Sequence, residues 1–180
     1  MTLTSRLARR DDVPGLMPLI AAATTQLLKP YLNDDQIRSS RAIMGLDTQL
    51  IDDGTYFVVE SDDVLAGCGG WSRRATLYGG DHSAGRDPAL LDPARDPAKI
   101  RAMYTHPAFA RRGVGRLVLS LCERAAAAEG FTVLELMGTM AGQPLYEAAG
   151  YRVLDHRTDS TGGAPVPLVR MRKTLPDRTS

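Results

Sequence analysis

The sequence has few of the features that mark exported, membrane-spanning or nucleic-acid-binding proteins. Its only cysteines, Cys68 and Cys122, lie in apolar segments, so we expect buried reduced thiols rather than a disulfide. No apolar run approaches the roughly 18 residues of a membrane span, and the first residues lack the pattern of a secretory signal. Lys plus Arg (22) nearly equals Asp plus Glu (21), which argues against a global field that attracts nucleic acid or an anionic membrane. No cluster of His, Cys and carboxylates has the spacing of metal ligands. We therefore expect a soluble, cytoplasmic protein without a metal site.

A chain of 180 residues is long enough for one domain with a substantial core. Glycine (17) and proline (11) stay below the share that marks low-complexity chains, which is roughly 25–30%. We expect the domain to occupy residues 1–175, and residues 176–180 to form a short flexible tail.

Hydrophobic periodicity and turn residues predict alternating strands and helices. Asp11 or Asp12 is a candidate N-cap for a first helix, in which Pro18 counts against regular geometry. A second helix is expected over residues 33–52. Residues 78–97 are rich in Gly and Pro and are expected to form a functional lid or a mobile excursion. Strands are expected at 4–10, 55–60, 64–71, 99–106, 132–137, 151–156 and 166–172, and further helices at 113–129 and 144–149.

Residues 104–116 carry the most informative pattern for function. A strand ends here, and a helix opens on a turn that contains Gly113 and Gly115. The first N–H groups of a helix lack intrahelical partners and carry about half a positive charge, and glycines let a ligand approach the backbone. The pattern indicates an anion site, most naturally for a diphosphate, although the glycines would equally serve a tight turn. Positive charge at the same place comes from Arg111, Arg112 and Arg116.

The run over residues 103–117 resembles the acetyl-CoA motif of the GCN5-related N-acetyltransferase (GNAT) superfamily, Gln/Arg-x-x-Gly-x-Gly/Ala at the start of a helix. Gly113 and Gly115 match the motif's glycines, whereas Ala110 replaces its Gln/Arg. A second element, Leu145-Tyr-Glu-Ala-Ala-Gly-Tyr151, is similar to the family's Leu-Tyr-Glu-x-x-Gly-Phe. The resemblance covers most of the chain. It implies a single α/β domain whose mixed, mainly antiparallel sheet is split near the motif strand and has helices on both faces.

The resemblance also implies roles for individual residues. Backbone groups of Met103 and Thr105 would pair with the pantetheine arm of acetyl-CoA. Tyr146 matches the tyrosine that protonates the departing thiolate, and a phenol with a pKa near 10 can donate its proton at pH 7. The alternative for Tyr146 is an ordinary core aromatic whose hydroxyl bonds to the backbone. Amides from Arg111 to Arg116 would cradle the pyrophosphate, so the implied acetyl-CoA-binding residues are Met103, Tyr104, Thr105, Arg111, Arg112, Gly113, Val114, Gly115 and Arg116.

The residue that removes a proton from the acceptor amine is not identified by the resemblance. Glu60 and Glu135 are the candidate carboxylates, and burial in an apolar strand would raise the pKa of Glu135. Structural roles for both, with water taking the proton, are the alternative. His82 and His106 are expected to face solvent. Trp71 is expected either to wall the acceptor cleft or to pack in the core.

These observations predict an acetyl-CoA-dependent N-acetyltransferase. We expect it to move an acetyl group to a primary amine by direct attack in a ternary complex. The acceptor, a small molecule or a peptide, is not identified, and a homodimer is left open. The alternative functions are a CoA-binding sensor without transfer, and an acyltransferase for a longer acyl chain or a hydroxyl acceptor.

Overall fold

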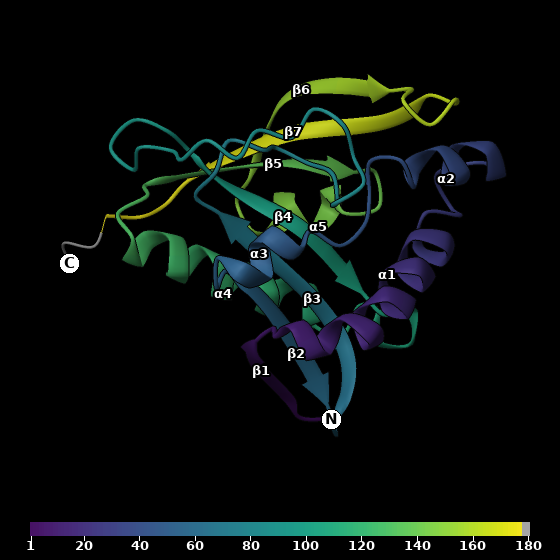
Figure 1. The fold of residues 1–180 in the computed structure, drawn as a ribbon, viewed down its shortest axis with the longest axis horizontal. Coiled ribbons are helices and arrows are strands. Elements are labelled where there is room, and N and C mark those ends of the chain that lie inside the picture. The colour runs from purple at the N-terminus through teal and green to yellow at the C-terminus, as the bar shows by residue number, and fades with distance from the viewer. Residues whose placement is uncertain (178–180) are drawn as a thin grey trace.

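One mixed sheet, in the order β1-β2-β3-β4-β5-β7-β6, organises the computed structural model, which describes residues 1–177 (Figure 1). All neighbouring strands are antiparallel except β4 and β5, which run parallel. The predicted α/β fold with a mainly antiparallel sheet is confirmed. The strands are β1 (Leu3–Leu7), β2 (Tyr56–Ser61), β3 (Val64–Ser72), β4 (Ala98–Thr105), β5 (Val133–Thr139), β6 (Arg152–Asp159) and β7 (Val166–Thr174). The helices are η1 (Arg10–Asp12), α1 (Val13–Leu27), α2 (Asp34–Ser40), α3 (Thr48–Asp52), η2 (Pro107–Phe109), α4 (Val114–Ala128) and α5 (Gln143–Ala148), where η marks a 3₁₀ helix.

Helices α1 and α4 cover opposite faces of the sheet. Successive side chains of a strand point to opposite faces, and on β2 the neighbours Val58 and Val59 belong to different core clusters. Val58 packs with residues of α1, and Val59 packs with residues of α4. Within residues 1–177, no helix has both the length and the apolar character that a membrane span requires.

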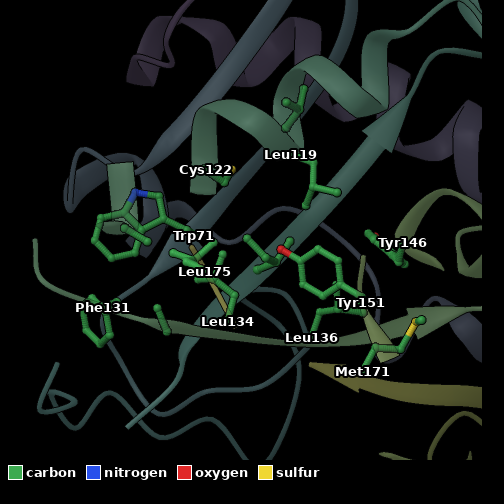
Figure 2. Close-up of a cluster of buried hydrophobic side chains, with 14 of the residues drawn as sticks. Trp71, Leu119, Cys122, Phe131, Leu134, Leu136, Tyr146, Tyr151, Met171 and Leu175 are labelled. Atoms are coloured by element: carbon green, nitrogen blue, oxygen red, sulfur yellow. The ribbon is translucent and has the colours of Figure 1, made fainter. Parts of the chain in front are cut away.

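The core on the α4 side is the larger cluster, and Figure 2 shows its centre. Trp71 lies here, 1% exposed, with its ring edge-on to Phe131 at a centroid distance of 5.9 Å. This decides between the two interpretations of Trp71, because it packs in the core. Cys122 is fully buried in the same cluster, and Cys68 is buried on the α1 side. Both are free thiols, as predicted.

Predicted boundaries are wrong at the second helix, at the first strand and at β6, which ends at Asp159 rather than at residue 156. The helix expected over 33–52 is two short helices, because the chain leaves helical geometry at 41–47, where Gly45 has a φ of +146°. Asp47 begins the second of them by accepting the Gln49 N–H at 3.0 Å. The first strand ends at Leu7 rather than at residue 10, and Pro18 lies inside a continuous α1. Residues 178–180 of the predicted tail lie outside the described residues.

The long segment between β3 and β4, residues 73–97, is called the β3–β4 insertion. It is irregular as expected, but it is fastened to the chain between α2 and α3. Ser83 donates its hydroxyl to the carbonyl of Ala42 at 2.8 Å, and the Asp81 N–H donates to Leu46 at 2.9 Å. The Arg86 guanidinium is paired with Asp47 at 2.5 Å. The insertion therefore forms a fixed wall beside the sheet.

Candidate active site

The parallel pair β4 and β5 separates after two residues. Only Ala98 with Leu134 and Lys99 with Glu135 are in register, and beyond them no further pairing between the two strands exists within the described residues. Figure 1 shows β4 and β5 diverging from this point. Between neighbouring strands elsewhere, backbone groups bond to each other, whereas here the facing edges are free for another partner. The split lies at the motif strand, where the family resemblance implied it.

A bulge in β4 lies directly at this split. Ala102 has a φ of +50°, and its carbonyl accepts the hydroxyl of Tyr56 at 2.7 Å. Past the bulge, the His106 N–H donates to Ala66 of β3 at 2.9 Å. Because backbone groups alternate between the two edges of a strand, those of Met103 and Thr105 point away from β3 and towards the gap.

Two adjoining cavities occupy the gap, with empty volumes of about 650 and 700 Å³. We call them the Arg101 cavity and the Gly115 cavity after one lining residue of each. The Gly115 cavity lies next to the start of α4 and also has α1 residues in its wall. The Arg101 cavity is bounded by the β3–β4 insertion and by β5. The two cavities share Met44, Met103, Tyr104, Thr139 and Tyr146.

Tyr146, on α5, lies where the two cavities meet. Its ring is held between Gly138 and Gly142, since a Cβ atom on either glycine would come within 3.1 and 2.9 Å of it. Its hydroxyl reaches only the sulfur of Met103, at 3.9 Å, and no backbone acceptor is recorded among the described residues. Burial raises the pKa of Tyr146 to about 12, so the hydroxyl stays protonated at neutral pH. Tyr146 thus presents a phenolic donor without a strong acceptor to the two cavities, which together we call the cleft.

The start of α4 forms a loop with alternating backbone handedness. Arg111 has a φ of +59° and Gly113 a φ of +85°, with Arg112 between them outside the positive region. Such alternation points successive N–H groups into one concavity, which is a typical anion site. A Cβ atom on Gly113 would meet nothing within 4 Å, whereas one on Gly115 would come within 2.8 Å of Leu145. Gly113 therefore serves the turn, and Gly115 the packing of α4 against α5.

The loop arginines, Arg111, Arg112 and Arg116, are exposed. Within residues 1–177 none of them forms an ion pair, and the one recorded contact is from Arg112 to the sulfur of Met1 at 3.9 Å. Their charge is therefore available to an anion at the start of α4.

Comparison with known proteins identifies the family. The model of the acetyltransferase (GNAT) family matches residues 21–151, which is well over half of the chain. The chain belongs to the GNAT family of acetyltransferases. Members of this family use acetyl-CoA as co-substrate. No curated protein sequence matches the chain.

Solved GNAT structures share the whole fold. A GCN5-related N-acetyltransferase from Rhodopseudomonas palustris is 18% identical over 97% of both chains, with a TM-score of 0.72. The PaiA N-acetyltransferase from Thermoplasma acidophilum, in complex with coenzyme A, is 13% identical over 97% of this chain and 100% of its own, with a TM-score of 0.65. YncA from Salmonella typhimurium, a putative acetyltransferase with acetyl-CoA, is 19% identical over 100% and 98%, with a TM-score of 0.64. At these identities the likeness establishes the shared fold.

Neither predicted carboxylate of this GNAT chain lines the cleft. Glu60 is paired with Arg6 at 3.1 Å on the outer part of the sheet. Glu135 is 4% exposed and binds Lys99 at 3.4 Å and Arg172 at 2.5 Å. Burial acts to raise the pKa of Glu135, as expected from the sequence, but the hydrogen bond from Arg172 and the charge of Lys99 outweigh it. Its pKa is lowered, so the prediction of a raised value is wrong.

The predicted histidines lie at the surface of the loops. His82 is exposed and its Nε2 lies 2.6 Å from the carbonyl of Arg41. His106 is half-buried and accepts the Ala108 N–H at 3.0 Å, which begins η2. Among the described residues, the linings of the Arg101 and Gly115 cavities contain no Asp, Glu or His. The acceptor's proton has no side-chain carboxylate or imidazole to receive it there.

Sequence reasoning missed the buried ion pair that shapes one wall of the cleft. Arg101 and Asp47, both at most 3% exposed, are joined at 2.9 Å, and Arg101 also donates to the carbonyl of Gly79 at 2.6 Å. Arg101 attaches the β3–β4 insertion to β4 through the carbonyl of Gly79, and it attaches the start of α3 through Asp47. The position of Asp47 before a helix was the one available sign of a structural role, but it could not point to Arg101, which lies 54 positions away.

Proposed function

We propose that this GNAT chain transfers an acetyl group from acetyl-CoA to a primary amine by direct attack within a ternary complex. The observation that carries the proposal is the alignment of three parts in one cleft. These are the anion cradle at the start of α4, the free backbone edge of β4, and a protonated tyrosine at the junction of the two cavities.

The cradle and the strand edge fit the cofactor's two ends. The amides from Arg111 to Arg116 would bind the pyrophosphate, with the loop arginines adding screened charge around it. Backbone groups of Met103 and Thr105 would bond to the amides of the pantetheine arm, which would occupy the place of a missing strand between β4 and β5. The complexes of PaiA with coenzyme A and of YncA with acetyl-CoA, which share this fold, are in keeping with this arrangement.

Tyr146 would act on the sulfur side of the reaction. In direct attack, the amine nitrogen forms a bond to the thioester carbonyl carbon and the carbon–sulfur bond breaks. Tyr146 donates its proton to the departing thiolate and recovers one from solvent, while the amine nitrogen loses one proton to water. The free hydroxyl and the raised pKa of Tyr146 suit a donor that is still protonated when the thiolate forms.

A covalent acetyl-enzyme route has poor support in this cleft. Cys68 lines the Gly115 cavity, but burial raises its pKa to about 12. A thiol that is not ionised is a weak nucleophile. Direct attack by the acceptor is therefore the simpler path.

Release of free coenzyme A, followed with a thiol reagent against a panel of primary amines, tests the proposal. We expect amine-dependent thiol release and intersecting initial-velocity lines. Parallel lines, together with loss of activity in Cys68→Ala, would instead indicate an acetyl-enzyme. Tight binding of acetyl-CoA without release for any amine would favour a sensor, and faster release from longer acyl-CoA esters would favour a different acyltransferase.

A further inference from the structure

A third cavity adjoins the Arg101 cavity on the side away from the anion cradle. We call it the Asp159 cavity, and its empty volume is about 680 Å³. It opens to solvent and is bounded by the β3–β4 insertion, the segment after α2 and the turn between β6 and β7. Tyr78 lies in the walls of both cavities, so the two meet at its side chain. The lining residues common to both are Ile43, Leu77, Tyr78 and Gly79.

Asp159 is the one charged residue among the described residues that line this cavity. Its carboxylate accepts two neutral donors, the Tyr78 hydroxyl at 2.7 Å and the Thr161 N–H at 2.9 Å. Within residues 1–177 it has no cationic partner, and the nearby Arg157 is paired with Asp155 at 3.1 Å. Partial burial acts to raise the pKa of Asp159, but the hydrogen bonds from Tyr78 and Thr161 lower it below its usual value. The cavity therefore holds an ionised carboxylate without a counter-charge.

The position of Asp159 is fixed by the turn that follows it. The turn is packed on α2, since a Cβ atom on Gly162 would come within 2.2 Å of the carbonyl of Ser39. The Ser39 hydroxyl donates to the carbonyl of Ala164 at 2.6 Å and accepts the Ala164 N–H at 3.1 Å. A carboxylate held in place in this way loses little side-chain entropy when it binds a cation. It can therefore select ligands that carry a positive charge at a set distance from the reacting amine.

We propose that Asp159 binds a second positive charge on the acceptor, so that the preferred acceptors are small diamines rather than monoamines. The inference rests on the proposed function. One amine of the acceptor would approach Tyr146 through the Arg101 cavity, and the distal ammonium would lie against Asp159. Hydrogen bonds to charged groups are worth enough to change relative affinity by about 10- to 100-fold.

The test uses straight-chain α,ω-diamines, each matched with the monoamine of the same chain length. Binding to the protein saturated with coenzyme A is measured by calorimetry, and turnover with acetyl-CoA by thiol release. For at least one chain length, we expect the diamine to bind the wild type about 10- to 100-fold more tightly and to show a similar advantage in kcat/KM. Asp159→Asn keeps the oxygen that accepts the Thr161 N–H, and should remove the advantage while leaving monoamines unchanged.

Asp63→Asn is the matched control, because Asp63 is exposed in the turn between β2 and β3 and lines none of the three cavities. It should keep the diamine advantage. Monoamine turnover without any diamine advantage, or equal losses for both classes in Asp159→Asn, would overturn the role of Asp159 and leave the proposed function standing. A diamine advantage in binding that Asp159→Asn abolishes, without turnover of any amine, would support Asp159 and refute the proposed transfer.

Discussion

Replacing Tyr146 with Phe separates a catalytic role of its hydroxyl from a structural one. The substitution keeps the ring between Gly138 and Gly142, and the ring contact with Tyr151 at a centroid distance of 6.0 Å. The hydroxyl's recorded contact is a sulfur atom at 3.9 Å, so its removal should change the free energy of unfolding by less than about 0.5 kcal/mol. In the reaction, the same hydroxyl would face a forming thiolate.

The expected loss of turnover follows from that charge. A hydrogen bond to a charged group contributes about 1.5–3 kcal/mol, which corresponds to roughly 10- to 150-fold in rate. If the hydroxyl transfers its proton fully, the expected loss of rate on its removal is about 10²–10⁴-fold. We therefore expect kcat to fall by about 100-fold or more in Tyr146→Phe, with the affinity for acetyl-CoA unchanged. Because the pKa of Tyr146 is about 12, the wild-type rate should not fall through its ionisation between pH 7 and about 10.

Tyr151→Phe is the matched control. Tyr151 is 3% exposed and donates its hydroxyl to Glu123 at 3.1 Å, but it does not line the cleft. Its substitution should cost about 1 kcal/mol of stability and leave turnover intact. Thiol release and thermal unfolding, measured on both variants, give the answer. Turnover within a few-fold of the wild type in Tyr146→Phe would refute the assignment of Tyr146 as the proton donor.

Three further predictions concern the anion cradle and the buried ion pair between Lys99 and Glu135. Gly113→Val should weaken coenzyme A binding at least tenfold in calorimetry because it disturbs a positive-φ turn, whereas Gly54→Val, at a φ of +71° away from the cleft, should strain the backbone without changing affinity. Alanine at all three loop arginines should weaken that binding mainly at low ionic strength, and an equal loss at high salt would show that these side chains bind the pyrophosphate directly. Glu135→Gln should destabilise the fold at pH 7 by about 3 kcal/mol, since it leaves the buried Lys99 without its partner. Because the folded-state pKa of Glu135 is lowered, the stability from its charge is present above about pH 4.5 and is lost as the pH falls through the lower folded value, which acid titration of Tm would follow.

Local signals predicted local structure well. Asn33 and Gln36 form the reciprocal cap that begins α2, and Gly113 begins α4 with the positive φ that a glycine turn favours. Features that depend on distant residues were not accessible. The pKa of Glu135 was predicted in the wrong direction because its cations come from β4 and β7, which the sequence does not place around β5. A binding role for Asp159 could not be predicted either, because it depends on the contact with Tyr78, which lies 81 positions earlier.

The short ladder between β4 and β5 has a consequence for folding. Within the described residues, strands β1–β4 are joined to strands β5, β7 and β6 by two paired positions between β4 and β5. The sheet therefore consists of two antiparallel units with little backbone hydrogen bonding between them. Within these units, β2 with β3 and β6 with β7 are pairs of consecutive strands, and such local pairing favours early formation. Native-state hydrogen exchange should therefore show two blocks of amides that open with different free energies. A molecule bound across the split would join these blocks, and in its presence their amides should exchange together.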